Sequence, residues 1–218
     1  KDLGAEDILL VAPYLPYMRQ DKRFHSGEGL TLRYFAELIS SYFSSLFTLD
    51  PHLHRYHDLS EIYDIPSRVG HAAPLLAEWI AANVETPVLI GPDSECEQWV
   101  SAVAKQAGAP FTVLNKTRHG DREVDISIPH IEHWRDHTPV LVDDIISGGH
   151  TMLETLSHLE SLGLPKTVCI GVHGIFAEGS DTELAKQFAQ MVTCNTIPHP
   201  SNAINISPLL VSNIRKLS

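Results

Sequence analysis

The chain has 218 residues, and 43% of them are hydrophobic, which is enough for a buried core in one or two domains. Its formal net charge of −11 argues against a nucleic-acid surface, since phosphate neutralisation requires basic patches. The three cysteines, Cys96, Cys169 and Cys194, are too widely spaced for a disulfide framework or a Cys-x-x-Cys zinc site. The sequence shows neither a signal peptide nor an apolar run near about 18 residues. We therefore expect a cytoplasmic protein with no nucleic-acid partner and no membrane partner.

Strand and helix patterns alternate along the chain. The first elements are the last turn of a helix at 1–5, a strand at 7–12, helical spacing through 30–47 and a short strand that ends at Asp50. The later elements are helices at 72–83, 95–106, 151–162, 184–190 and 209–215, and strands at 87–90, 111–115, 139–142 and 168–172. Residues 121–128 form either a β-ribbon or an ordered loop base. This alternation predicts an α/β fold with parallel sheets and right-handed crossovers.

One segment combines an apolar strand, two acids and a glycine turn that opens a helix. Asp143 and Asp144 end the strand, and Ser147, Gly148 and Gly149 form the turn. Glycines let backbone N–H groups approach an anion, and the N-terminal end of a helix attracts a phosphate. The two acids would be repelled by phosphate alone, so they indicate ribose hydroxyls or a divalent cation. The segment predicts a sugar-phosphate cradle, and the alternative is a capped turn with solvated acids.

The cradle resembles the ribose 5-phosphate loop of the type I phosphoribosyltransferase fold, and other segments narrow the resemblance to the ribose-phosphate pyrophosphokinase family. The run Pro13-Tyr14-Leu15-Pro16-Tyr17-Met18-Arg19-Gln20-Asp21-Lys22 is similar to that family's ATP-contacting strand end. Further segments follow in the family's order: Asp50-Pro51-His52, Gly91-Pro92-Asp93, Lys116-Thr117-Arg118 and Thr196-Ile197-Pro198-His199-Pro200-Ser201-Asn202. The resemblance therefore covers essentially the whole chain.

This resemblance implies two related phosphoribosyltransferase-like domains. The first, at 1–66, is expected to be truncated, because the family's N-terminal segment has no match here. The second, at 67–208, carries the ribose 5-phosphate loop, and a helix at 209–218 is expected to return to the first domain. The resemblance also implies a homodimer or a higher homo-oligomer.

The implied reaction moves the β,γ-diphosphoryl group of ATP to the anomeric hydroxyl of ribose 5-phosphate, with Mg²⁺ as cofactor. Lys116 and Arg118 would be catalytic. ATP would be bound by Arg19, Gln20 and Asp21, and the metal by Asp50, His52 and Asp93. Ribose 5-phosphate would be bound by Asp93, Asp143, Asp144, Ser147, Gly148, Gly149, His150 and Thr151. Several of these residues follow predicted strands, and ligands of open parallel sheets bind at the carboxyl ends of the strands.

Some positions depart from the family pattern. Gly148 stands where the family has Thr, and His150 replaces a Gly, which predicts strain if position 150 needs positive φ. Glu95 and Cys96 stand where the pyrophosphate loop has two glycines. These departures keep open a non-catalytic or regulatory paralogue. A second alternative is a metal hydrolase, because His52-x-His54 on a strand would put two imidazoles on one face.

Overall fold

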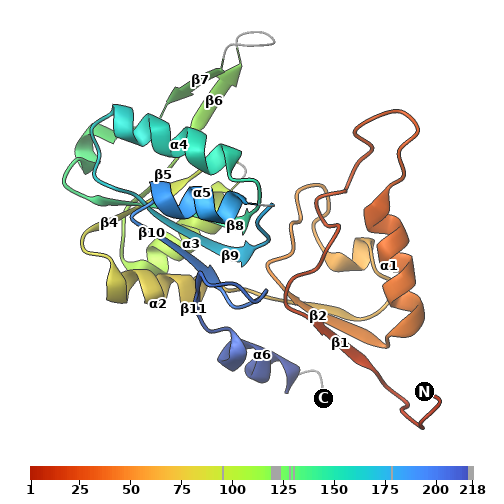
Figure 1. Cartoon of the computed structure of the whole chain (residues 1–218). Coiled ribbons are helices and arrows are strands. Elements are labelled where there is room, and N and C mark those ends of the chain that lie inside the picture. The colour runs from red at the N-terminus through yellow and green to blue at the C-terminus, as the bar shows by residue number, and fades with distance from the viewer. Residues whose placement is uncertain (95, 119–123, 128, 130, 178, 216–218) are drawn as a thin grey trace. The chain divides into compact units, whose positions relative to one another are not determined.

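A computed structural model describes residues 1–94, 96–118, 124–127, 129, 131–177 and 179–215. The chain divides into two compact units. Unit 1 is formed by Lys1–His71 together with the C-terminal segment from Ser207, and unit 2 is Ala72–Ile206. Each unit contains a parallel sheet and helices (Figure 1), as the α/β pattern of the sequence predicts.

Unit 1 is built on a three-stranded parallel sheet in the order β1-β2-β3. Its elements are β1 (Leu9–Ala12), α1 (Thr31–Tyr42), β2 (Ser45–Leu49), the 3₁₀ helix η1 (Leu59–Glu61), β3 (Ser67–Gly70) and α6 (Ser207–Ile214). Its buried core consists of Leu15, Met18, Leu32, Ala36, Ile39, Leu46, Leu59, Ile62 and Tyr63. The apolar face of α1 supplies three of these side chains, so burial against the rest of the core stabilises the helix.

Two predictions in unit 1 were wrong. The helix predicted at 30–47 ends at Tyr42, and Phe47 lies on β2 with no exposed surface. Because β2 is the central strand and is buried on both faces, its apolar run does not alternate, and it looks like a continuation of the helix pattern. Residues 1–5 form a turn, closed by the Gly4 N–H to the Lys1 carbonyl at 2.9 Å, where a helix end was expected.

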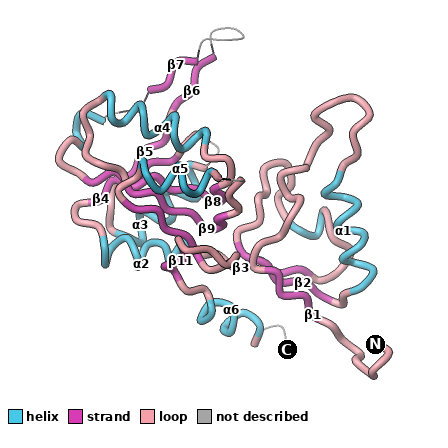
Figure 2. The backbone as a smooth tube through the Cα atoms, in the orientation of Figure 1, coloured by secondary structure: helices cyan, strands magenta, loops and turns pink. Residues whose placement is uncertain are grey.

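Unit 2 contains a six-stranded parallel sheet in the order β11-β10-β9-β8-β4-β5, which Figure 2 shows with its helices. Its helices are α2 (Ala73–Asn83), α3 (Glu97–Ala107), the 3₁₀ helix η2 (Ile131–Trp134), α4 (His150–Ser161) and α5 (Ser180–Gln187). Its strands are β4 (Pro87–Gly91), β5 (Phe111–Val113), β8 (Thr138–Ile146), β9 (Val168–Gly174), β10 (Gln190–Cys194) and β11 (Asn202–Ile204). A separate antiparallel ribbon joins β6 (Asn115–Arg118) to β7 (Val124–Ser127).

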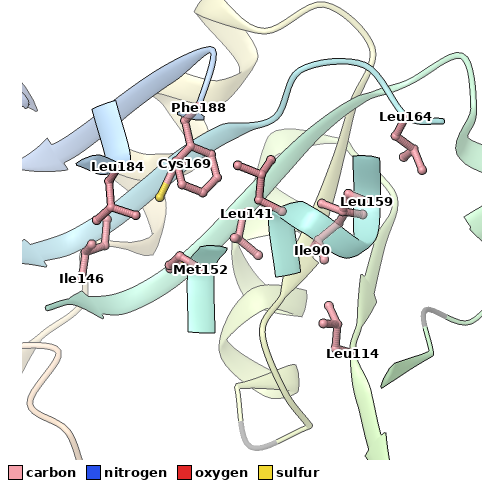
Figure 3. Close-up of a cluster of buried hydrophobic side chains, with 11 residues drawn as sticks. Ile90, Leu114, Leu141, Ile146, Met152, Leu159, Leu164, Cys169, Leu184 and Phe188 are labelled. Atoms are coloured by element: carbon pink, nitrogen blue, oxygen red, sulfur yellow. The ribbon is translucent and has the colours of Figure 1, made fainter. Parts of the chain in front are cut away.

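The core beneath α4 and α5 fixes the end of unit 2 that carries the cradle (Figure 3). Met152 and Leu159 of α4 and Leu184 of α5 pack in one cluster with Leu141 of β8 and Cys169 of β9. All of these side chains are at most 2% exposed. Both helices are thereby anchored to β8, which leads into the cradle, and to β9.

Four elements of unit 2 differ from the prediction. Strand β8 continues through both acids to Ile146, because β9 pairs with it up to Ile146. The helix predicted at 184–190 begins at Ser180 and ends at Gln187, since Gly179, with φ of 76°, forms its N-cap. Residues 190–194 are a strand, and neither this strand nor β11 was predicted. Of the segment 121–128, residues 124–127 form one strand of the ribbon, whereas 121–123 and 128, like residue 95, lie outside the described residues.

No helix in the described part of the chain is both long and apolar enough to span a membrane.

Candidate active site

The predicted cradle is a tight turn between β8 and α4. Gly149 is the N-cap of α4 with φ of 76°, and His150 is the first helical residue. Position 150 is not among the residues with positive φ, so the strain expected at His150 was wrong. The left-handed conformation falls one residue earlier, on a glycine, where it has no steric cost. The turn therefore directs its backbone toward the start of α4 without strain.

The segment that follows β9 supports this turn through its main chain. Ile175 donates its N–H to the Ile146 carbonyl at 2.9 Å, and Ala177 donates to the Ser147 carbonyl at 3.4 Å. The hydroxyl of Ser180 also donates to the Ser147 carbonyl, at 2.9 Å. The first residues of the cradle are thus fixed from one side by a segment distant in sequence.

The acids at the lip of the cradle lie close to Asp93. The Asp143 carboxylate accepts the Asp144 N–H at 2.9 Å. Burial raises the pKa of Asp143 well above its ordinary value, and the negative charges of Asp144 and Asp93 raise it further. The structure therefore brings together three of the predicted ribose 5-phosphate residues, Asp93, Asp143 and Asp144. Sugar hydroxyls or a cation at this position would stabilise the ionised carboxylates.

Asp93 also closes its own loop onto Cys96, a residue that the sequence did not identify as functional. Cys96 donates its N–H to the Asp93 carboxylate at 3.2 Å and its thiol to the Asp93 carbonyl at 2.9 Å. Burial raises the pKa of the Cys96 thiol to about 12, despite the hydrogen bond with Asp93 that acts in the opposite direction. The thiol therefore stays protonated at neutral pH and serves as a hydrogen-bond donor within the loop.

The predicted ATP-binding residues lie in unit 1, in and after the turn that follows β1. Arg19 and Gln20 are exposed, and the Gln20 N–H binds the Tyr17 carbonyl at 2.9 Å. Asp21 is less accessible, because its carboxylate pairs with the Arg55 guanidinium at 3.4 Å and its side chain is 10% exposed. Arg55 was not predicted, and nothing in its spacing from Asp21 marks the pair.

The predicted metal residues Asp50 and His52 follow β2 in unit 1. Asp50 is buried and has φ of 33°, an unfavourable conformation that is enriched at functional sites. Its carboxylate lies 3.1 Å from Nδ1 of His71, and this hydrogen bond raises the pKa of His71. His71 was also missed by the sequence analysis, because it lies beyond β3 and carries no motif.

The two imidazoles of the hydrolase alternative do contact each other, with the ring centroids of His52 and His54 3.8 Å apart. However, residues 51–56 are not a strand, so the expected geometric basis for the pair was wrong. Among the residues that the structure describes, no three His, Cys, Asp or Glu side chains form a group that could hold a metal ion.

Lys116 and Arg118 lie on β6 of the ribbon, opposite Ile126 and Val124 of β7. The described backbone at these residues is a strand that pairs antiparallel with β7. The ribbon gives the backbone of these two residues a regular, extended conformation.

Comparison with known proteins agrees with this fold. The family model described as phosphoribosyl transferase domain matches residues 58–209. The ribose-phosphate pyrophosphokinase of Methanopyrus kandleri is 30% identical over 221 residues, which cover 100% of this chain and 75% of that protein. The corresponding protein of Pyrococcus furiosus is 28% identical, over 97% of this chain and 75% of its own length.

A solved structure gives the same result. The phosphoribosylpyrophosphate synthetase of Mycobacterium smegmatis superposes with a TM-score of 0.82 at 25% identity, covering 98% of this chain and 72% of that chain. The fold and the cradle thus define a protein of the phosphoribosyltransferase type, and the predicted fold class is confirmed. Within that class, the chain belongs to the ribose-phosphate pyrophosphokinase family, as the sequence motifs predicted.

Proposed function

We propose that this chain transfers the β,γ-diphosphoryl group of ATP to the anomeric hydroxyl of ribose 5-phosphate. The observation that carries the proposal is the cradle, in which paired acids on β8 precede a glycine turn and the start of α4. In the reaction, the hydroxyl oxygen bonds to the β-phosphorus and the bond from that phosphorus to the α-phosphate oxygen breaks. The hydroxyl proton is released, AMP leaves and phosphoribosyl pyrophosphate is the product.

The sugar phosphate would occupy the cradle of unit 2. Backbone N–H groups of 147–151, at the N-terminal end of α4, would receive the 5-phosphate, because that end of a helix carries partial positive charge. Asp143 and Asp144 would accept hydrogen bonds from ribose hydroxyls. In the free protein, burial raises the pKa of Asp143. Hydrogen bonds from ribose hydroxyls would stabilise its ionised form.

Arg19, Gln20 and Asp21 would contact ATP. The predicted Mg²⁺ ligands are Asp50, His52 and Asp93. Asp50 and Asp93 offer the carboxylate oxygens that Mg²⁺ prefers, and the buried, strained Asp50 fits a dedicated ligand. Mg²⁺ often takes one or two carboxylates together with substrate phosphates, so a cage of protein ligands is not required. When bound, it would neutralise charge on the diphosphoryl oxygens.

Lys116 and Arg118 would stabilise the charge that develops on the migrating group. Phosphoryl transfer depends mainly on positioning and on neutralising nonbridging oxygens, for which ammonium and guanidinium groups are suited. Both residues lie on the same strand, β6, of the ribbon. We further propose that the two units are related phosphoribosyltransferase-like halves and that the chain forms homo-oligomers.

A non-catalytic, regulatory protein is the second candidate. The observation that favours it is the Asp93–Cys96 turn, in which the Cys96 N–H and thiol both donate to Asp93 and not outward to a diphosphate. Such a protein would bind ribose 5-phosphate in the cradle but would not turn over ATP.

One assay separates the two candidates. The purified chain is incubated with ATP and Mg²⁺, and AMP release is measured with ribose 5-phosphate, with ribose or with no sugar. Of the three conditions, we expect AMP release only in the one that contains ribose 5-phosphate. Asp143→Asn should lose this release. The control Asp136→Asn, at an exposed acid outside the cradle, should release AMP at the normal rate. Binding of ribose 5-phosphate by calorimetry without AMP release would support the regulatory candidate. Absence of both would refute the proposed function.

A further inference from the structure

Ser180 occupies a position from which it controls the direction of one peptide group in the cradle. It is the first residue of α5, it is 9% exposed, and its hydroxyl lies 2.9 Å from the Ser147 carbonyl oxygen and 2.8 Å from the Ala177 carbonyl oxygen. A serine hydroxyl has one proton and can donate to only one of these oxygens at a time.

The two carbonyls differ in their other partners. The Ala177 carbonyl already accepts the backbone N–H of Ser180 itself, at 2.9 Å. The Ser147 carbonyl accepts the Ala177 N–H at 3.4 Å, which is long for an N–H···O hydrogen bond. Donation of the Ser180 hydroxyl to the Ser147 carbonyl is therefore the more stabilising choice. At 2.9 Å it is shorter than the 3.4 Å contact that the Ala177 N–H makes with the same oxygen.

Fixing the Ser147 carbonyl also fixes the next N–H group. The peptide between Ser147 and Gly148 is planar and trans, so its C=O and N–H point in opposite directions. With the carbonyl held toward Ser180 of α5, the Gly148 N–H points away from α5. Glycine has the least restricted backbone of all residue types. Without the hydrogen bond from Ser180, the peptide between Ser147 and Gly148 can therefore rotate easily.

We propose that Ser180 is a positioning residue that sets the affinity for the 5-phosphate by orienting the Gly148 N–H. The inference rests on the proposed function, in which backbone N–H groups of 147–151 receive that phosphate. Ser180 contacts neither substrate. It acts through the Ser147–Gly148 peptide, so its loss weakens the binding of ribose 5-phosphate without changing the chemistry at the anomeric oxygen.

The test uses the full chain with Ser180→Ala, Ser180→Thr and a matched control. Ser161→Ala is the control, because Ser161 likewise donates its hydroxyl to a backbone carbonyl, that of His158 at 2.7 Å, at the opposite end of α4. The dissociation constant of ribose 5-phosphate is measured by calorimetry, and KM for both substrates and kcat by AMP release. Thermal unfolding reports on the fold of each variant.

We expect Ser180→Ala to raise the Kd and KM of ribose 5-phosphate about three- to tenfold, the loss of one hydrogen bond. Its kcat and its KM for ATP should stay within about twofold of wild type, Ser180→Thr should restore binding, and Ser161→Ala should match wild type. An unchanged Kd of ribose 5-phosphate in Ser180→Ala would overturn the role of Ser180 but leave the proposed function standing. Equal increases in KM for ATP and for ribose 5-phosphate would do the same. A wild-type chain that does not bind ribose 5-phosphate would overturn the proposed function and this inference with it.

Discussion

Leu184 closes the space beside Gly149: a Cβ added at Gly149 would stand 2.8 Å from both Cδ1 and Cδ2 of Leu184. Gly149 also has φ of 76°, a conformation that side chains disfavour. Two independent physical constraints thus require glycine at the N-cap of α4. The packing of α5 and the shape of the cradle are therefore coupled through this contact as well as through the Ser180–Ser147 hydrogen bond.

Gly149→Ala should therefore be strongly destabilising. The left-handed backbone costs about 1–2 kcal/mol and the overpacking against Leu184 about 1–3 kcal/mol, so we expect a loss of about 2–5 kcal/mol in the free energy of unfolding. Gly163→Ala is the matched control, because Gly163 has the same φ of 76° with no atom within 4 Å of an added Cβ. Denaturant unfolding of both variants checks the prediction, and equal losses would show that the Leu184 contact contributes nothing.

Gly148 differs from its neighbour, and Gly148→Thr should be tolerated. The nearest atom to an added Cβ is Cδ2 of His150 at 3.6 Å, an ordinary contact, and φ lies outside the left-handed range. We expect a stability change within about 0.5 kcal/mol. The added hydroxyl should lower the Kd of ribose 5-phosphate about three- to tenfold, because it supplies one more donor to the phosphate.

Gly148→Ala separates the hydroxyl from the loss of backbone freedom, since it adds a Cβ without a donor. Calorimetric titration with ribose 5-phosphate should show tighter binding in Gly148→Thr than in Gly148→Ala. If both variants bind with the same affinity, position 148 does not face the phosphate.

Lys116→Ala and Arg118→Ala should each lower kcat about a hundredfold or more, the usual effect of removing one group that stabilises transition-state charge. The Kd of ribose 5-phosphate should stay within about twofold, because the cradle lies between β8 and α4 and not on the ribbon that carries Lys116 and Arg118. Lys105→Ala, which removes an exposed lysine at the end of α3, controls for the loss of positive charge. Single-turnover measurement of AMP release is the direct readout, and unchanged rates in both variants would exclude these residues from the mechanism.

The parallel α/β fold could be predicted from the sequence because most strands and helices have distinct apolar periods. The prediction of individual strands and helices failed where the spacing of apolar residues does not distinguish a strand from a helix or a loop. The buried central strand β2 has no alternation, and α5 begins with the polar run Ser180-Asp181-Thr182-Glu183. Strands such as β3 and β11 are too short to show a pattern.

The cradle could be predicted because its acids, glycines and helix start are contiguous in sequence. Its supports could not, because they are tertiary contacts between distant residues. Ser180 reaches Ser147, and Leu184 reaches Gly149, only after the sheet of unit 2 forms. The contact between His71 and Asp50 in unit 1 could not be predicted for the same reason. The shift of the left-handed residue from position 150 to Gly149 likewise depends on where α4 begins. Motif spacing fixes neither feature.

Asp181 beside Ser180 provides a pH-dependent test of how α5 is held. Its pKa is lowered, first by the N–H of Thr182 and then by His199, whose Nε2 lies 3.4 Å from the Asp181 carboxylate. The Ser201 N–H donates to Nδ1 of His199 at 3.1 Å, so the neutral ring carries its proton on Nε2, facing Asp181. A carboxylate whose pKa is lower in the folded state stabilises that state above its unfolded pKa of about 3.9.

Asp181→Asn should therefore be less stable than wild type at pH 7, and the difference should shrink as the pH falls below about 4, where the wild-type carboxylate becomes protonated in both states. Asp136→Asn, at an exposed position outside α5, controls for the loss of one negative charge. Urea unfolding of the three proteins between neutral and acidic pH measures the effect. A difference between Asp181→Asn and wild type that persists unchanged through the acidic range would show that ionisation of Asp181 does not hold α5 in place.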